Sequence, residues 1–165
     1  MTLAEAAAEA DALAESGDAK ALAVLRSQWD DEIEADARNP DYRVRSLAYR
    51  AIAQFRFRQK LELLRRGLED ESPSVRGSAL VSLERLSRDS PGVVNNVRAL
   101  LHEMVNADGN QAVRRLAIVC LRNGSPQRET IVLLEGVGED DEADRELREV
   151  AAKVAAQLRK RANAR

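Results

Sequence analysis

One nine-residue pattern recurs along the chain and constrains its fold more than any other feature. Val-Arg-x-x-Ala-x-x-x-(Ile/Leu) is present at residues 44–52, 75–83 and 113–121, and a degenerate copy that begins Leu-Arg is present at 147–155. The motif arginines recur at intervals of 31, 38 and 34 residues. A period of this size is typical of stacked supersecondary units, so we expect a repeat protein.

The residues of the motif have the spacing of a helix that packs on one side. Its first, fifth, eighth and ninth positions form one apolar stripe on a helix with 3.6 residues per turn. Thr occurs only twice and aromatic residues make up only 3%, which argues against strands. We therefore predict an all-α fold, with helices at about 2–15, 18–37, 41–56, 58–69, 73–88, 91–106, 110–122, 125–136 and 141–162.

Each of the four prolines follows a residue that caps helices well. The pairs are Asn39-Pro40, Ser72-Pro73, Ser90-Pro91 and Ser125-Pro126. Proline is tolerated in the first helical turn because its missing N–H would have no partner there, and Asn or Ser accepts a bond from that turn. The pairs predict four helix starts, and the short links between helices favour antiparallel neighbours.

The motif, with an aspartate a few residues upstream of each copy, resembles the HEAT-repeat family, including the bacterial HEAT-like repeats of phycobilin-lyase type. The resemblance covers roughly residues 18–160. It implies a right-handed α-α superhelix, a solenoid of about four helical hairpins with capping helices. We expect a single domain over 1–165 that consists of an acidic cap helix at 1–17 and hairpins at 18–56, 57–90, 91–123 and 124–163.

The resemblance also implies a role for the motif arginines. In the HEAT family this arginine commonly pairs with the upstream aspartate of an adjacent repeat. The resemblance therefore implies a structural ladder composed of Arg45, Arg76, Arg114, Arg148, Asp41, Asp70, Asp108 and Asp144.

The net charge of −2 conceals an acidic segment followed by a basic one. Residues 1–42 carry 11 acids and 3 bases, whereas residues 43–66 carry 8 bases and one acid. All five aromatic residues lie between positions 29 and 57, and we expect Trp29, Phe55 and Phe57 in the core. The basic segment either pairs with the acidic one or forms a basic patch of Arg43, Arg50, Arg56, Arg58 and Lys60.

Residues that carry catalysis or bind metals are sparse. His102 is the only histidine and Cys120 the only cysteine, so His/Cys metal clusters are excluded and nucleophile–histidine pairs would all depend on His102. No glycine-rich phosphate loop is present, and no apolar run approaches the ~20 residues that cross a bilayer. We expect a cytoplasmic, non-enzymatic protein without metal, cofactor or membrane segment, which is a monomer or a weak oligomer.

The positions opposite the apolar stripe of the motif helices predict a binding face with an apolar centre. A groove that follows a nucleic-acid backbone should be basic throughout. Our hypothesis is therefore a scaffold or adaptor module that binds an unidentified partner protein or helix. Its predicted contacts are Arg50, Val81, Arg115, Val119 and Arg122. Two alternatives stay open: nucleic-acid binding through residues 43–66, as in HEAT-like DNA glycosylases, and chromophore handling like that of phycobilin lyases.

Overall fold

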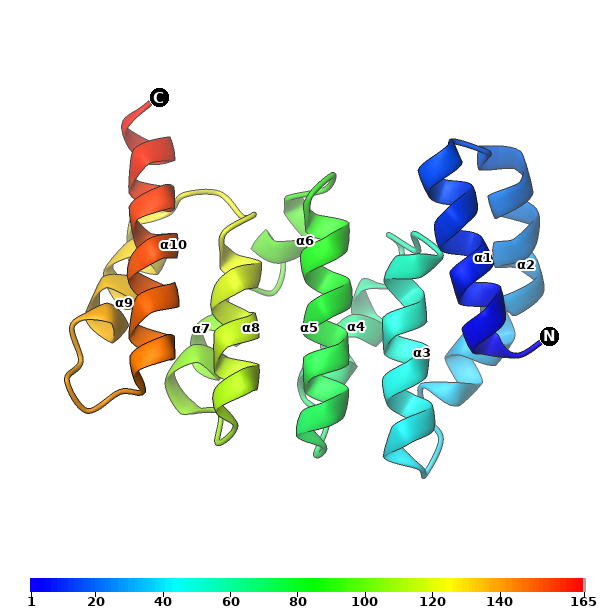
Figure 1. Cartoon of the computed structure of the whole chain (residues 1–165), viewed down its shortest axis with the longest axis horizontal. Helices are drawn as coiled ribbons and strands as arrows, with labels where there is room; N and C mark the ends of the chain where they lie inside the picture. Colours follow the sequence, from blue (N-terminus) through cyan, green and yellow to red (C-terminus); the bar gives the residue numbers. More distant parts are fainter. Residues whose placement is uncertain (165) are drawn as a thin grey trace. The chain divides into compact units, whose positions relative to one another are not determined.

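The computed structural model describes residues 1–164, and the regular structure of these residues is helical throughout (Figure 1). The helices in chain order are α1 (Leu3–Ser16), α2 (Ala19–Asp36), α3 (Tyr42–Gln54), α4 (Leu61–Leu68), α5 (Pro73–Ser87), α6 (Gly92–Asn95), α7 (Arg98–Ala107), α8 (Gln111–Leu121), α9 (Arg128–Gly138) and α10 (Arg145–Asn163). The predicted all-α class is confirmed.

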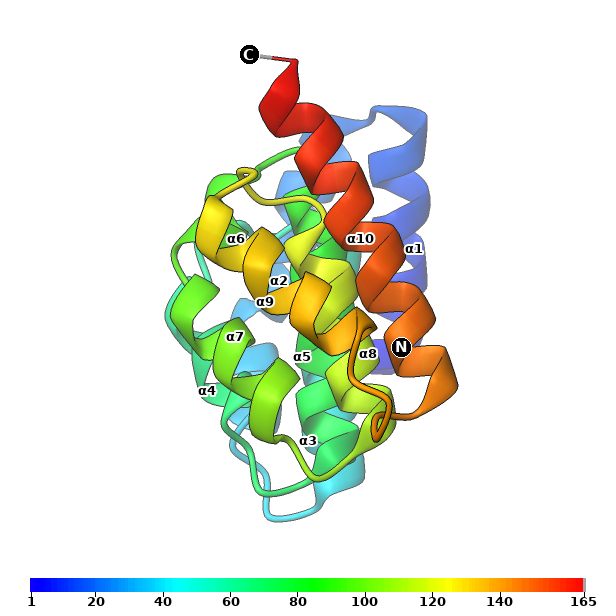
Figure 2. The same ribbon diagram turned by 90° about the vertical axis from the view of Figure 1, so that its left-hand side faces the viewer.

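The chain divides into two compact units, one of residues Met1–Leu86 and the other from Ser87 onward. In the first unit α1, α3 and α5 form one layer and α2 and α4 form the other (Figure 1 and Figure 2). In the second unit α8 and α10 form one layer, and α7 and α9 form the other. Within each unit the motif helices therefore share a layer, as a repeat of helical hairpins requires.

The small residue of the motif is completely buried in every copy. Ala48, Ala79, Ala117 and Ala151 are all 0% exposed. A methyl group at this position lets the helix approach its neighbours closely, while the larger aliphatic residues of the stripe fill the space on either side. Burial of each such aliphatic side chain stabilises the fold by about 1.5–3 kcal/mol.

Helix starts coincide with the prolines at only one of the four pairs. α5 begins at Pro73, but α3 begins at Tyr42 with Asp41 as its N-cap. The start predicted at Ser125-Pro126 is wrong, because α9 begins at Arg128. Ser125 is instead occupied by tertiary hydrogen bonds, since its hydroxyl and carbonyl oxygens both accept from Arg98.

The single helix predicted over 91–106 is also wrong, because it is divided into α6 and α7. Val97 interrupts it with φ −118° and ψ 15°, and it follows a run of β-branched and Asn residues that favour helices weakly. The break places the side chain of Asn95 beside Arg98, whose Nη2 donates to Asn95 Oδ1. Asn95 Oδ1 also accepts from the N–H of Ser125 at 3.1 Å, so the break in the helix is accompanied by a tertiary polar contact.

α3 ends at a residue with unusual backbone geometry. Arg56 has φ +58°, the left-handed conformation that ends many helices and usually requires glycine. The N–H groups of Arg56 and Phe57 donate back to the carbonyl oxygens of Ala53 and Ile52 at 2.9 and 3.0 Å. An arginine is held in this conformation because its side chain is fixed by several partners, which are described below.

Candidate functional site

Serine hydroxyls join α3 to α5 in the first unit. Ser46 Oγ lies 3.0 Å from Ser74 Oγ, and one turn further along Arg50 Nε donates to Ser78 Oγ at 3.3 Å. Ser78 is only 2% exposed. The interaction therefore attaches the guanidinium of Arg50 to a fixed point of α5.

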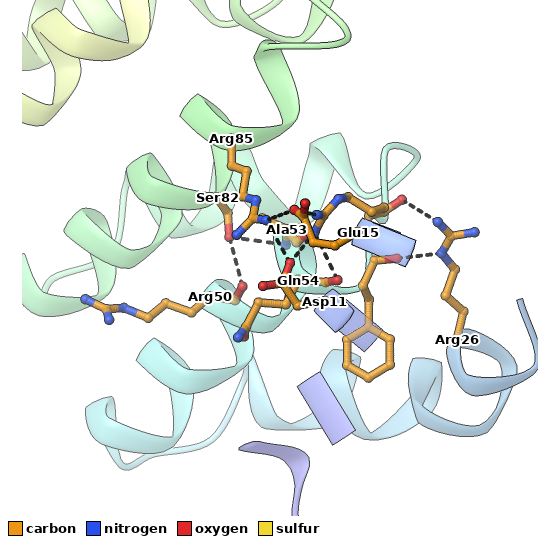
Figure 3. A network of polar contacts seen from close by, with 10 residues as sticks. Asp11, Glu15, Arg26, Arg50, Ala53, Gln54, Ser82 and Arg85 are labelled. Carbon is orange, nitrogen blue, oxygen red and sulfur yellow. Dashed lines mark hydrogen bonds and ion pairs between the residues drawn. The ribbon is translucent and has the colours of Figure 1, made fainter. Parts of the chain in front are cut away.

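A third serine of α5 continues this contact into the core. Ser82 is fully buried and donates to the carbonyl oxygen of Tyr49. Its Oγ accepts from the N–H of Ala53, with the nitrogen 3.4 Å away (Figure 3). Because residues four apart lie on one side of a helix, Ser74, Ser78 and Ser82 form one row on α5. We call this contact between α3 and α5 the serine seam.

Two aliphatic side chains lie exposed beside the serine seam. Leu47 is 44% exposed and Val81 is 40% exposed. Leu47 is three residues from Arg50 on α3, and Val81 is three residues from Ser78 on α5, so each lies about 60° around its helix from a residue of the seam. Leu47, Arg50 and Val81 form a mixed apolar and cationic patch, which we call the seam patch.

The five contact residues predicted from sequence are divided between the two units. Arg50 and Val81 lie in the first unit, while Arg115, Val119 and Arg122 lie on or just after α8 in the second. Arg115 is partly exposed, and its Nη1 lies 3.6 Å from Asp144 Oδ2 and 3.5 Å from Glu146 Oε2. Val119 and Arg122 are half-buried. The sequence analysis missed Leu47, because its position in the motif borders the buried stripe.

Arg56 of the basic segment is bound to acids of α1. Its Nη1 lies 2.8 Å from Asp11 Oδ1 and its Nη2 lies 3.2 Å from Glu15 Oε1. Arg85 of α5 contacts the same two carboxylates at 2.8 and 3.0 Å (Figure 3). The side chain of Arg56 is only 15% exposed, so it belongs to a network that links α1, α3 and α5 rather than to a free surface.

The end of α3 is enclosed by arginine donors. Arg56 Nη1 donates to the carbonyl oxygens of Ala53 and Gln54 at 2.8 and 3.2 Å, as a cation near a helix C-terminus should. Arg26 of α2 donates from Nε to the carbonyl oxygen of Phe55 at 2.6 Å. Burial lowers the pKa of Arg26, and the neighbouring cations Arg58 and Arg56 lower it further.

Lys60, also of the basic segment, is bound to acids of α2. Its Nζ donates to Asp30 Oδ1 at 2.5 Å and to Glu34 Oε1 at 2.7 Å, and it lies 4.8 Å from the centre of the Phe57 ring. Burial opposes the charge, but the two carboxylates outweigh it and raise the pKa of Lys60. The hydrogen bond from Lys60 lowers the pKa of Glu34, because it stabilises the carboxylate.

Much of the predicted basic patch therefore pairs with carboxylates. Arg56 and Lys60 pair with acids of α1 and α2, and the exposed Arg43 pairs with its neighbour Asp41. Arg58 and Arg50 are exposed. The acidic segment and the basic segment thus neutralise much of each other within the first unit.

The structural ladder is present at its first rung. Arg45 Nε and Nη2 donate to the two carboxylate oxygens of Asp70 at 2.9 and 3.0 Å, and both side chains are nearly buried, with 11% and 12% exposed. The hydrogen bond to Asp70 raises the pKa of Arg45. Arg45 in turn keeps the pKa of Asp70 below its usual value, although burial opposes this shift.

Arg76 and Arg114 donate to backbone carbonyl oxygens. Arg76 Nη1 donates to the carbonyl oxygen of Asp70 at 2.9 Å, and Arg114 Nε donates to that of Val105 at 2.7 Å. The Nε of Arg148 is buried without a hydrogen-bond partner among the described residues. The remaining ladder aspartates, Asp41, Asp108 and Asp144, accept from the backbone N–H groups of Arg43, Asn110 and Leu147.

The second unit contains a buried arginine that the sequence analysis did not single out. Arg98 is 7% exposed, and its Nη1 donates to Thr130 Oγ1 at 2.7 Å. His102 Nε2 lies 2.9 Å from the same hydroxyl oxygen. Burial lowers the pKa of Arg98, and it is also the main reason for the lowered pKa of His102.

A surface cavity of about 720 Å³ lies beside α2 and α4, and its charges largely cancel. The residues that line it include Glu34, Arg38, Lys60, Glu62, Leu63, Arg65, Arg66 and Glu69. Lys60 and Arg38 already bind Glu34, and the two remaining arginines are matched by two glutamates. No single ligand charge is favoured there.

Among the described residues, Cys120 and His102 do not form a nucleophile–histidine pair. Cys120 is fully buried, and His102 shares a hydroxyl with Arg98. Among residues 1–164 no cluster of three or more His, Cys, Asp or Glu side chains could bind a metal ion. Within the same range no helix has both the length and the apolar character needed to cross a membrane.

Layers of short helical hairpins define an α-helical repeat protein. More particularly, residues 33–104, from the end of α2 into α7, match the sequence model of HEAT repeats, so the resemblance inferred from the motif is confirmed for this segment. HEAT repeats generally mediate protein interactions. No curated protein matches the chain.

Proposed function

We propose that this protein is a non-enzymatic interaction module that binds a partner protein through the exposed face of its motif helices. The observation that carries the proposal is the seam patch. The aliphatic residues of the repeating stripe are almost all buried, yet Leu47 and Val81 lie exposed on the two helices that the serine seam joins. Exposed aliphatic residues that are grouped next to an arginine are typical of protein interfaces.

The second unit offers a corresponding surface on α8. Val119 occupies the motif position of Val81 and is partly accessible, with Arg115 and Arg122 on either side of it in the sequence. We propose this group as a second contact region, and it is tested separately from the seam patch.

Affinity capture from the native host, with bound proteins identified by mass spectrometry, tests the proposal. We expect Val81→Glu and Val119→Glu to reduce capture of the same partner, and the double variant to abolish it. Val132→Glu on α9 is the matched control, because Val132 is 55% exposed but lies on a helix without the motif. Unchanged capture by a folded double variant would rule out this face.

Nucleic-acid binding through residues 43–66 has weaker support. Arg56 and Lys60 are bound to carboxylates, and phosphates would have to compete with these internal partners. A gel-shift experiment with duplex DNA at about 50 mM salt distinguishes the two functions, because binding through phosphates is strongest at low salt. A retarded complex that is lost on substitution of Arg43 and Arg58 would favour the alternative.

A further inference from the structure

Arg50 differs from its neighbours in the basic segment by the kind of group that it contacts. Arg43, Arg45, Arg56 and Lys60 each pair with a carboxylate. Arg50 instead donates from Nε to the neutral hydroxyl of Ser78. No carboxylate of residues 1–164 forms an ion pair with Arg50. Its positive charge therefore has no internal counterpart.

The contact with Ser78 leaves the outer edge of the guanidinium available. Ser78 is buried and binds Nε, while the two Nη groups have no hydrogen-bond partner among the described residues. In Figure 3 the side chain of Arg50 extends away from the Arg56 network. A guanidinium held in this way can donate two parallel hydrogen bonds to a carboxylate, and less side-chain entropy is lost because Nε is already fixed.

Apolar contact surface lies next to this cation. Leu47 and Arg50 are three residues apart on α3, and Val81 is one turn beyond Ser78 on α5. Arg43 is four residues before Leu47, so Leu47 lies between two arginines along the same side of α3. Arg43 is 76% exposed at its side chain, but it is paired with Asp41, so Arg50 is the cation of the patch that is available to a partner.

This combination determines the chemistry of a matching partner. A partner needs apolar side chains to cover Leu47 and Val81, and a carboxylate within about one turn of one of them to reach Arg50. An amphipathic helix presents such a pair three or four residues apart. The backbone of duplex DNA offers phosphates but no aliphatic group beside them that would cover the two side chains.

We infer that the seam patch binds an acidic amphipathic helix of a partner protein, with a Glu or Asp carboxylate on Arg50 and aliphatic side chains of the same helix over Leu47 and Val81. This inference rests on the proposed function and specifies the partner's chemistry in the first unit.

The test is selection from a display library of helix-forming peptides of about 18 residues, a length at which isolated helices become stable. Every peptide carries the same Leu stripe, and the positions that border the stripe are varied among Glu, Gln and Lys. The full chain is used as bait in five forms: unchanged, Arg50→Gln, Arg50→Glu, Val81→Glu and Arg66→Gln. Arg66 is the matched control, because it is an exposed arginine on α4, outside the seam patch.

We expect the unchanged protein and Arg66→Gln to select peptides with Glu at a bordering position. Arg50→Gln should weaken those peptides about tenfold, because a hydrogen bond to a charged group is lost. Arg50→Glu should reverse the preference from Glu to Lys. Arg50 is exposed, so these variants should keep the fold, which circular dichroism verifies.

Three results would overturn the inference. Peptides that bind without preference for Glu, but are lost on Val81→Glu, would reject the acidic partner and leave the proposed function standing. No selection by the unchanged protein would reject the helical ligand, and the affinity-capture comparison would then decide the proposed function alone. Displacement of the selected peptides by duplex DNA in an Arg50-dependent manner would identify the patch as a phosphate site.

Discussion

The two units hold their buried cations in opposite ways. In the first unit, Arg45 is paired with Asp70, and Lys60 is paired with Asp30 and Glu34. In the second unit, Arg98 is equally buried but is surrounded by the hydroxyl, amide and carbonyl oxygens of Thr130, Asn95 and Ser125. The pKa of Arg45 is raised by its carboxylate, whereas that of Arg98 is lowered by burial.

This difference shows what the acidic and basic segments of the sequence do. The acids of α1 and α2 are the counter-ions of cations that close the first unit, so the charge reversal near residue 42 is largely a feature of folding. In the second unit, by contrast, the buried Arg98 donates to neutral acceptors. Removal of a cation should therefore have different consequences in the two units.

The largest effect is expected where a buried charge would lose its partner. Arg45→Met keeps an apolar side chain of similar length but leaves the carboxylate of Asp70 nearly buried and without its bidentate donor. We expect a loss of about 3 kcal/mol in the free energy of unfolding. Urea unfolding followed by fluorescence measures it, because Trp29 is the only tryptophan and lies in the first unit. Arg43→Met is the control, because Arg43 is exposed. An equal loss in the free energy of unfolding for the two variants would contradict the expectation.

A smaller change in stability is expected when one glycine of each unit is replaced by alanine. A Cβ at Gly67 would lie 2.5 Å from Cε1 of the buried Tyr49 ring, whereas a Cβ at Gly136 meets no atom within 4 Å. Gly67→Ala should destabilise the protein by about 2 kcal/mol through overpacking. Gly136→Ala in α9 should instead stabilise it by about 0.5–1 kcal/mol through helix propensity. Thermal unfolding followed by circular dichroism checks both signs, and a loss at Gly136 would show that its space is occupied.

The substitution Arg98→Met tests the buried cation of the second unit in the same way. No buried carboxylate is left behind, so an apolar side chain of similar size should change the free energy of unfolding by about 1 kcal/mol or less, in either direction. Arg98→Ala should cost more, because it also leaves a cavity. A loss from Arg98→Met as large as that from Arg45→Met would mean that neutral oxygens compensate a buried guanidinium as well as a carboxylate does.

The smallest effect is a difference in pH response. The pKa of His102 is lowered, mainly by burial and further by Arg98, while Glu129 opposes the shift. The folded state therefore favours neutral His102, and this stabilisation is complete above the ordinary value of about 6.5 and is lost as the pH falls below it. In the first unit, the lowered pKa values of Asp70 and Glu34 keep their pairs intact until well below pH 5.

Between pH 7 and pH 5 the second unit should consequently weaken while the first does not. Urea unfolding by circular dichroism over this range should show a falling stability that His102→Gln removes, since glutamine can still bind Thr130 but does not titrate. A variant with the same pH dependence as the unchanged protein would assign the effect to other groups.

The parts of the fold that were predictable depend on local pattern. The Val-Arg-x-x-Ala spacing identified the helices and their buried side, since both follow from the 3.6-residue period. The break at Val97 and the late start of α9 were not predictable, because both are associated with the hydrogen bonds of Ser125 to Asn95 and Arg98 across the fold. A tertiary hydrogen bond between segments some 30 residues apart has no local signature.

The same distinction applies to the candidate site. Arg50 and Val81 could be assigned to the exposed side by their motif position alone. Leu47 could not, because a leucine at the border of the stripe is compatible with either burial or exposure. Whether Arg56 and Lys60 form a surface was also open, and the answer depends on which acids of α1 and α2 the hairpin geometry brings to them.

The serine seam has a consequence for the accuracy of assembly. Repeat helices that meet through aliphatic side chains can slide by one residue and still find apolar neighbours. Hydroxyl groups at positions 74, 78 and 82 meet partners at 46, 50 and 49–53, so a shift of one residue would misplace all three contacts together. The row of serines thus fixes the register of α3 against α5. It thereby also fixes the positions of Leu47, Arg50 and Val81 relative to one another.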